Sequence, residues 1–565
     1  MVKMLVKGWH LLRRYILTVE RFDLFLQGAL LVTVFLETNV QLLLRRTTGH
    51  YLPSVDEDWL SIGAGGAEFL FGAFVSWWGR GRRQLALAGW LGLTAAAGLV
   101  VLAFPFPDAE VPRVELCGGD PITAYNTAIP KSEVSGPLAD HDPLATGRTF
   151  ALAATTVLCA LTKISVWAHG FTYLDDHQPE NGPYFYGILI SIRLSLGLSG
   201  RNWLRAASLS STWWEPQLSL AALTLMFSIL FTLFPRKQPG AEIEEPELDC
   251  ILNPLGRLLR NRAMMLQALS MSLLLAAVFG YVKYDNELVQ SKFNVESERW
   301  DPRTARTAHD IFRSLVIIFL VSVFRMRFSG RRRDGVKTAV AARVGGVAAA
   351  GAAVLFAALA AMTCRAATVA GADDVYTQPE CSSSCGCQSE LYGFSPVCAV
   401  DSATTYYSPC HAGCHEYEDL NGYLIFGNCT CGTGSLRAVR GGCGVDDCWT
   451  IYSVYLVLYT VVLAVTGAAL LMQGMGVARA TSRRDKPLAF GATFALAGLL
   501  ANVLGYALYV LIGHVTCMYY SGGTCALQGG GGAAVGGASA ALAALSAAAS
   551  VLAGRAASTV DIPTR

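Results

Sequence analysis

The sequence is poor in charged residues. Asp, Glu, Lys and Arg make up only 15% of its 565 residues, against about 25% in soluble domains. The charges nearly cancel, because 44 Lys and Arg residues stand against 42 Asp and Glu residues. This balance excludes a strongly basic nucleic-acid binder, and the 53% hydrophobic content excludes a disordered chain. A mean hydropathy of +0.40, with the apolar residues in long blocks, predicts a membrane protein.

Motifs of several enzyme classes are also missing. The sequence has no Gly-x4-Gly-Lys phosphate loop, no HExxH zinc motif and no Gly-x-Ser-x-Gly nucleophile elbow. We therefore expect no enzymatic activity, no cofactor and no metal ion. Without an ATP site, any transport would be secondary or facilitative.

Twelve apolar stretches approach the roughly 20 residues that cross a bilayer as a helix. They are residues 22–44, 62–78, 85–104, 150–170, 184–204, 218–234, 263–282, 311–324, 340–362, 451–475, 490–512 and 533–552. The eighth is the weakest, because it is short and contains Arg313. The N-terminal region does not resemble a cleavable signal peptide, since its apolar stretch is long and lacks a clear cleavage site.

The distribution of Lys and Arg sets the expected orientation. Cytoplasmic loops carry an excess of these residues, and the excess is obtained when both termini are placed in the cytoplasm. This orientation places the cysteine-rich segment outside, where disulfides persist. We expect a multi-pass plasma-membrane protein.

The chain divides into two groups of six expected spans. A polar, glutamate-rich segment at 238–249 suits a linker between two pseudo-symmetric halves. We expect a six-helix half at 1–237, a cytoplasmic linker at 238–262, helices seven to nine at 263–376, an extracellular module at 377–448, and helices ten to twelve with a tail at 449–565. The Ala/Gly runs at 339–361 and 529–549 suit close-packed membrane helices, with flexible linkers as the alternative.

Ten of the 16 cysteines are concentrated in the expected extracellular module. They are Cys381, Cys385, Cys387, Cys398, Cys410, Cys414, Cys429, Cys431, Cys443 and Cys448. An even number permits five disulfides, but the spacing does not give their connectivity. A zinc site is the alternative, and the outside location favours disulfides. The sequon Asn428-Cys429-Thr430 makes Asn428 a candidate glycosylation site.

Two motifs carry a family resemblance. Thr405-Tyr406-Tyr407-Ser408-Pro409-Cys410-His411-Ala412-Gly413-Cys414 resembles a Kazal-type module, in particular the one between spans nine and ten of the organic-anion-transporting polypeptides. Gly170-Phe171-Thr172-Tyr173-Leu174-Asp175-Asp176 is similar to a motif at the end of that family's span four. Cys517 and Cys525 also fit the family's last outer loop, as two further disulfide candidates. The chain is thus identified as a divergent member of this family.

The resemblance implies a fold and a function. It implies an all-α major-facilitator fold with twelve transmembrane helices and a small disulfide-rich Kazal-like module outside. It also implies sodium-independent uptake of large amphipathic organic anions, such as steroid conjugates, bile-acid-like compounds, eicosanoids or hormones, with an exchanged anion such as bicarbonate. The family signature near span six is reduced to Trp213-Trp214, and the arginine pattern of helix eleven is replaced by Asn502, Gly505 and Tyr506.

Ionisable side chains inside apolar stretches are costly, and they usually face one another or a water-filled cavity. With neighbouring polar and aromatic residues they give the substrate-binding candidates Glu37, Glu68, Lys163, Arg193, Lys283, Asp285, Tyr455, Tyr459, Asn502 and Tyr506. We expect Arg193 and Lys163 to attract an anion, with Glu37 and Glu68 as their partners or as proton acceptors. The alternatives are a Glu37–Lys163 pair that only fixes helix packing, and tyrosines that belong to an interfacial belt.

Arg80, Arg82, Arg83, Asp175 and Asp176 lie at expected cytoplasmic ends of spans. We expect them to form gating contacts that hold one access state, since a ligand shifts such an equilibrium by its differential affinity. The alternative for the arginines is that they only set the topology. For the whole chain, the alternatives to a transporter are a membrane-anchored Kazal-type protease inhibitor, an adhesion or scaffold protein, and a channel.

Overall fold

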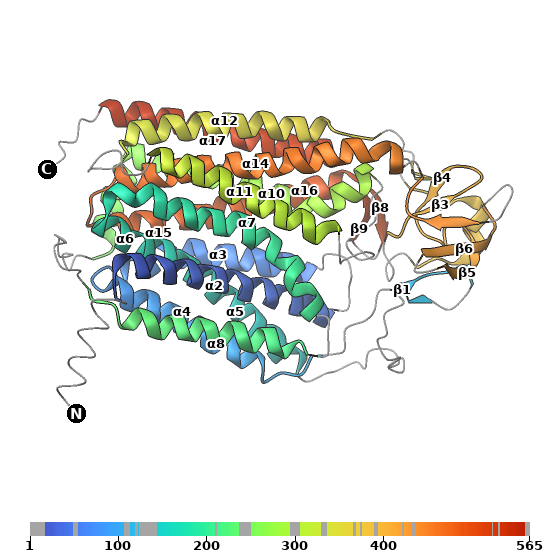
Figure 1. Ribbon diagram of the computed structural model, residues 1–565, viewed down its shortest axis with the longest axis horizontal. Coiled ribbons are helices and arrows are strands. Elements are labelled where there is room, and N and C mark those ends of the chain that lie inside the picture. Colours follow the sequence, from blue (N-terminus) through green and yellow to red (C-terminus); the bar gives the residue numbers. More distant parts are fainter. Residues whose placement is uncertain are drawn as a thin grey trace.

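The computed structural model describes residues 17–48, 55–106, 113–118, 122–123, 144–208, 212–236, 250–293, 305–328, 336–364, 369–372, 376–388, 394–420, 423–431, 437–443, 445–521, 524–528 and 531–559. Long helices run alongside one another, and a small β-rich module projects from one end of the bundle (Figure 1). Among the described residues, nine helical stretches are long and apolar enough to cross a membrane. The expectation of a mainly helical membrane protein is confirmed.

The first helix group comes from the N-terminal part of the chain. It consists of α2 (Val19–Thr48), α3 (Val55–Trp77), α4 (Arg83–Val101), α5 (Ala145–Ser165), α7 (Gly182–Ser208) and α8 (Trp214–Thr232). α5 continues through a π-helical segment, η1 (Val166–Phe171), into α6 (Thr172–His177), and the short η2 (Pro179–Asn181) precedes α7. The first six apolar stretches coincide with these helical segments.

The second helix group follows. It consists of α9 (Leu252–Arg260), α10 (Arg262–Phe293), α11 (Ala305–Phe328), α12 (Thr338–Ala361), α14 (Val445–Arg479), α15 (Lys486–Ala497), α16 (Tyr506–Val515) and α17 (Gly531–Thr559). A second π-helical segment, η4 (Gly498–Gly505), joins α15 to α16. Both Ala/Gly runs are helical, and α12 packs against α17. A Cβ atom on Gly536 of α17 would lie 2.6 Å from that of Ala360, so small residues permit this close approach.

The two helix groups meet along two seams. α3 packs against α15 and η4, while α7 packs against α11 and α14. On the first seam, a Cβ atom on Gly491 would overlap the side chain of Ser76 and lie 2.6 Å from the carbonyl oxygen of Gly72. The helix backbones therefore approach each other closely where the two groups join.

The projecting module is a five-stranded antiparallel sheet in the order β4-β3-β7-β6-β5. Its strands are β3 (Val397–Ala399), β4 (Thr404–Tyr406), β5 (Cys414–Leu420), β6 (Tyr423–Cys429) and β7 (Ala438–Arg440), and η3 (Glu380–Cys385) lies beside it. The short β1 (Arg113–Val114), from the segment between α4 and α5, pairs with β2 (Ile122–Thr123) and contributes Val114 to the module's core. A hairpin of β8 (Cys517–Ser521) and β9 (Thr524–Gln528) lies between α16 and α17. Gly413 has a φ of +69°, and a Cβ there would overlap Thr430, so glycine is required at this point of the motif.

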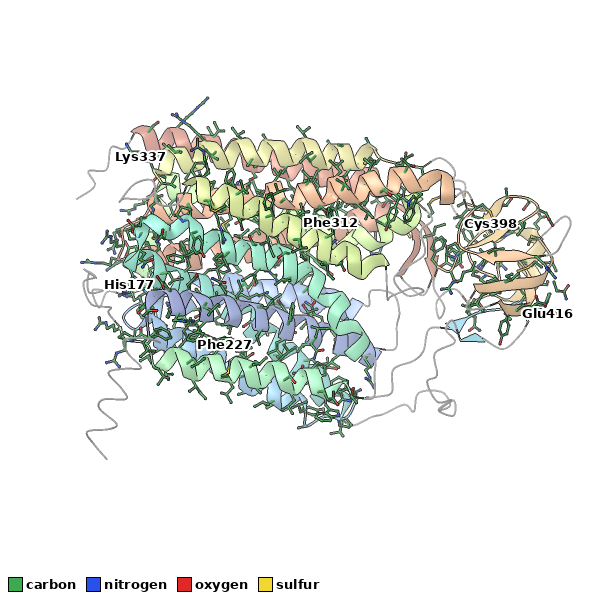
Figure 2. All side chains as sticks on the ribbon, viewed as in Figure 1. His177, Phe227, Phe312, Lys337, Cys398 and Glu416 are labelled. Atoms are coloured by element: carbon green, nitrogen blue, oxygen red, sulfur yellow. A yellow bond between two sulfur atoms is a disulfide. The ribbon has the colours of Figure 1, made fainter. Side chains whose placement is uncertain are left out.

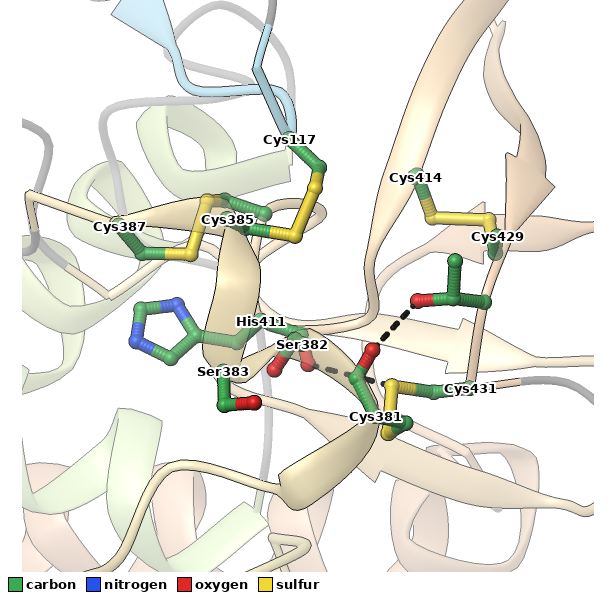
Figure 3. The surroundings of a disulfide bond; sticks show 12 residues. Cys117, Cys381, Ser382, Ser383, Cys385, Cys387, His411, Cys414, Cys429 and Cys431 are labelled. Atoms are coloured by element: carbon green, nitrogen blue, oxygen red, sulfur yellow. Dashed lines mark hydrogen bonds between the residues drawn. A yellow bond between two sulfur atoms is a disulfide. The ribbon is translucent and has the colours of Figure 1, made fainter.

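Disulfides hold the module together and anchor it to the bundle, and Figure 3 shows those in the neighbourhood of Cys385. Four bridges lie within it: Cys381–Cys431, Cys387–Cys410, Cys398–Cys443 and Cys414–Cys429. Two more lead out of it, from Cys385 to Cys117 beside β1 and from Cys448 to Cys364 after α12. The module is therefore not closed by five bridges of its own ten cysteines.

The remaining cysteines are placed as follows. Cys517 is also disulfide-bonded, and the side chain of Cys525 lies outside the described residues. Among the residues that the structure describes, one group, Glu115 with Cys387 and Cys410, has metal-binding spacing. Its two sulfurs already form a disulfide, so they are not free thiolates for the zinc alternative.

The first described helix begins, and the last one ends, on the same side of the bundle, away from the sheet. The ring of Phe22, at the start of α2, stacks on Tyr173 of α6 with 4.3 Å between centroids. Gly554, near the end of α17, lies beside Ala342 at the start of α12. Figure 2 shows His177 and Lys337 at this end, while Cys398 and Glu416 lie in the sheet at the other. We call the end with His177 and Lys337 the distal end.

Candidate functional site

A buried carboxylate on α2 organises the centre of the first helix group. The Nζ atom of Lys163 on α5 lies 2.6 Å from Oε1 of Glu37, and a guanidinium nitrogen of Arg193 on α7 lies 4.0 Å from Oε2. The side chains of Glu37 and Lys163 are 12% and 13% exposed, whereas that of Arg193 is 26% exposed. One carboxylate thus faces two cations, and the more accessible cation is the one held more loosely.

Arg193 also reaches the second helix group. Its guanidinium carbon lies 5.3 Å from the ring centroid of Phe279 on α10, within the range of a cation–π interaction. The charged cluster is therefore in contact with both helix groups.

A second buried carboxylate crosses the α3–η4 seam. Asn502 Nδ2 donates a hydrogen bond of 2.6 Å to Glu68 Oε2, and a Cβ atom on Gly498 would lie 2.8 Å from the carbonyl oxygen of Gly65. π-Helical turns inside α-helices occur frequently at functional sites, and η4 carries Asn502 at this contact. Glu68 and Asn502, both candidates from the sequence, are thus brought together across the two groups.

The remaining substrate-binding candidates are dispersed. Lys283 Nζ lies 3.5 Å from the ring centroid of Tyr506. Tyr455 and Tyr459 are buried inside the second group, where the hydroxyls of Tyr455 and Tyr281 are 2.8 Å apart. Neighbouring Tyr452 is also buried, at 7% exposed. The side chain of Asp285 lies outside the described residues.

A network of five charged side chains joins the two helix groups at the distal end. Asp175 of α6 accepts hydrogen bonds from both terminal nitrogens of Arg479, at 2.7 and 3.0 Å, and one of 2.6 Å from Lys486 Nζ. Lys486 also lies 3.0 Å from Asp176, which is 2.6 Å from Arg83. Asp175 is fully buried, so the α14 and α15 ends are fixed to α6 by charge-assisted hydrogen bonds.

This network contains only part of the expected gating set. Arg83, Asp175 and Asp176 take part, while Arg80 lies over the ring of Trp77 at 5.5 Å and Arg82 is exposed. The sequence did not indicate that Arg479 and Lys486 belong to this network, because basic residues after a span are also ordinary topology determinants.

A buried histidine is a further residue that the sequence reasoning missed. His169 lies in η1, is fully buried, and has its Nε2 atom 3.0 Å from the carbonyl oxygen of Val75 on α3. The available signal was its position directly before the Gly170–Asp176 motif.

Family membership follows from the sequence comparisons. A sequence model of the Organic Anion Transporter Polypeptide (OATP) family matches residues 203–531, which is more than half of the chain. This chain belongs to the OATP family. The resemblance found in the sequence is thereby confirmed.

Individual OATP relatives are distant. Solute carrier organic anion transporter family member 2B1 of Rattus norvegicus is 29% identical over 148 residues, which cover 25% of this chain and 21% of the relative. Member 6C1 of Mus musculus is 22% identical over 427 residues, or 64% of this chain and 57% of the relative. The chain thus spans about a fifth to about three fifths of the length of these two relatives.

Solved transporter structures also align with this OATP chain. The crystal structure of the human organic anion transporter MFSD10 (TETRAN) has a TM-score of 0.49 at 13% identity, covering 95% of this chain and 99% of that one. The Major Facilitator Superfamily transporter FucP in its outward conformation has a TM-score of 0.48 at 11% identity, covering 94% and 97%.

Proposed function

We propose that this OATP chain transports organic anions across the membrane by alternating access between its two helix groups. Family membership supports the class of substrate, and the relatives' names state organic anion transport for those proteins. The observation that carries the proposal is the Glu37 cluster, where two cations share one buried carboxylate. The second cation, Arg193, is available to an anionic ligand at a contact between the groups.

The finer architecture belongs to the same proposal. We propose twelve membrane spans in two halves of six, a Kazal-type module outside the cell, and both termini in the cytoplasm of a plasma-membrane protein. The element order supports this arrangement, as does the location of the start of α2 and the end of α17 at the same, distal end. Substrates would be large and amphipathic, and uptake would need no sodium and would exchange against an anion such as bicarbonate. Asn428 is exposed, which supports glycosylation at its sequon.

The charge network at the distal end supplies the proposed gate. Its ion pairs link α6 of one group to α14 and α15 of the other, so they hold the distal end closed. Opening that end requires these pairs to separate, and a substrate favours opening only through its greater affinity for the open state.

Substitution of Arg193 tests the proposal. Arg193→Ala should raise the KM for a labelled steroid conjugate about tenfold or more, since hydrogen bonds to charged groups contribute roughly 1.5–3 kcal/mol. Arg193→Lys retains the charge and should lose less. Arg82→Ala is the matched control, because Arg82 is exposed at the distal end. Equal KM values in all three variants at equal surface expression would contradict the proposed role of Arg193.

A protease-inhibitor or adhesion role for the module would leave the buried Glu37 cluster without a function. Failure of the surface-expressed chain to take up any of a panel of steroid conjugates, bile-acid-like compounds and eicosanoids would favour that alternative. Uptake measured with sodium replaced by choline would test the ion requirement in the same cells.

A further inference from the structure

The short helix α9 presents an apolar and basic face that the bundle does not cover. Leu252 and Leu259 are 70% and 57% exposed, and their spacing of seven residues places them on one side of the helix. Arg260, next to Leu259, and Arg262, two residues further on, are also exposed. Another side of the helix faces the bundle, because Leu258 is only 3% exposed and belongs to the main core.

Local contacts hold α9 rigidly at the distal end of the bundle. Asn261 ends the helix with an extended backbone, donates a hydrogen bond of 2.7 Å to the carbonyl oxygen of Ala480, and accepts one of 3.2 Å from the backbone of Met264. Arg257 lies 3.1 Å from Asp485. These contacts tie α9 to the ends of α14 and α15, at the level where the bundle's long helices terminate.

Exposed leucines flanked by arginines are typical of helices that lie in a membrane interface. Such helices insert their apolar side at the boundary between headgroups and acyl chains, while the basic residues attract anionic lipids. The bundle's apolar flanks already fix where the bilayer must lie, so a helix anchored at its end meets the headgroup layer. A soluble partner would have to compete with this adjacent surface.

We propose that α9 docks on anionic lipid headgroups of the leaflet at the distal end, with Leu252 and Leu259 inserted and Arg260 and Arg262 at the phosphates. This membrane contact is separate from transport, because none of these residues belongs to the Glu37 cluster. The neighbouring sequence offers a competing partner for the arginines in Glu242, Glu244, Glu245, Glu247 and Asp249, which lie outside the described residues.

The chain offers a natural reporter position for the test. Cys250 is free and exposed, two residues before α9, and the other free cysteine that the structure describes, Cys159, is buried. Full-length protein labelled at Cys250 with a polarity-sensitive maleimide fluorophore is reconstituted into nanodiscs of phosphatidylcholine alone or of phosphatidylcholine with phosphatidylserine. Emission at shorter wavelength, and quenching by nitroxide-labelled lipid, report insertion.

We expect a larger blue shift and stronger quenching with phosphatidylserine. Removal of each arginine should weaken the docking equilibrium roughly fivefold, so R260Q/R262Q should lose the phosphatidylserine effect while R260K/R262K retains it. L252S/L259S should lose quenching in both lipids. Lys337→Gln removes another exposed cation at the distal end and should change nothing. All substituted side chains are exposed, so each variant should elute as the wild type does in detergent.

Other outcomes would overturn the proposal. The same emission in both lipids for the wild type, or unchanged quenching in R260Q/R262Q, would show that α9 does not recognise anionic lipid. A phosphatidylserine effect that appears only after Glu244→Gln and Glu245→Gln would assign the arginines to the acidic segment instead. An inactive transporter with the expected probe response would leave this inference intact and contradict only the transport proposal.

Discussion

Glu37 is a single carboxylate that lies between two cations of the first helix group, Lys163 and Arg193. Its loss leaves Lys163 as a largely buried ammonium group without a counter-charge at 2.6 Å. Removing one partner of a buried ion pair costs about 3–5 kcal/mol, and the 12–13% exposure of the two side chains favours the lower end of this range. We therefore expect the Glu37–Lys163 pair to have a structural role, and Arg193 to be the better candidate for binding substrate.

We accordingly expect Glu37→Gln to lower the melting temperature of the detergent-solubilised protein. Lys163→Met should also destabilise it, while the double variant should recover most of the loss, because the pair's desolvation penalty disappears with both charges. Together with the wild type, the three variants form a double-mutant cycle. If the double variant lost as much stability as the two single variants together, the pair would contribute no coupling energy.

Residue identities at the site could be predicted better than their pairings. Charged residues are rare inside apolar stretches, so Glu37, Lys163 and Arg193 are conspicuous in the sequence. Their geometry depends on how the helices are rotated, which periodicity does not determine when every face is apolar. Arg479 and Lys486 were missed because a cation at the end of a span has the same sequence signature whether it pairs with Asp175 or faces solvent.

A histidine in the β-rich module predicts a pH dependence. Burial lowers the pKa of His411 to about 4, and its Nδ1 atom lies 2.7 Å from Ser408 Oγ. An unfolded histidine binds a proton below a pH of about 6.5, whereas the folded one does so only near 4. Neutral His411 therefore stabilises the module fully above pH 6.5, and this contribution is lost as the pH falls towards 4.

Hydrogen–deuterium exchange of the full chain, corrected for intrinsic rates, should show faster exchange in residues 408–414 at pH 5 than at pH 7. His411→Gln should remove most of this pH dependence, and His415→Gln should not, because His415 is exposed. An identical pH response in the two variants would assign the effect to another group.

Helices in this protein follow from composition, but their irregularities do not. Every predicted apolar stretch coincides with a helical segment, because about 20 apolar residues have few alternatives in a bilayer. The π-helical segments η1 and η4 were not predicted, since one inserted residue leaves no trace in a uniformly apolar run. Both segments carry polar side chains that contact α3, namely His169 and Asn502.

The α3–α15 seam predicts a specific sensitivity to added volume. Gly491→Ala places a methyl group against Ser76 and the backbone of Gly72, so the two helices must separate. We expect reduced uptake and a melting temperature several degrees lower, since overpacking costs roughly 1–3 kcal/mol. Gly63→Ala and Gly66→Ala on α3 are matched controls, because a Cβ there meets no atom within 4 Å. Equal uptake in all three variants would show that the seam tolerates separation.

At the scale of the whole molecule, the two groups are connected differently at opposite ends. The module is bonded to the segment between α4 and α5 of the first group through Cys117 and to the second group through Cys364. These covalent links could not be predicted, because 268 residues separate Cys117 from Cys385 and connectivity is not encoded in spacing. The distal end is instead closed by ion pairs between α6 and the ends of α14 and α15, which are reversible, as the proposed gate requires.

Breaking those ion pairs should shift the access equilibrium without unfolding either group. Asp175→Asn removes the charge that Arg479 and Lys486 share, and exchange in residues 172–181 and 479–488 should become faster as the distal end opens more often. Asp485→Asn is the matched control, because its ion pair with Arg257 lies within the second group. Uptake should fall in the first variant, since a transporter that favours one access state completes fewer cycles. Faster exchange of the same size in Asp485→Asn would mean that the network only supports local folding, and the gate would then have to lie elsewhere along the two seams.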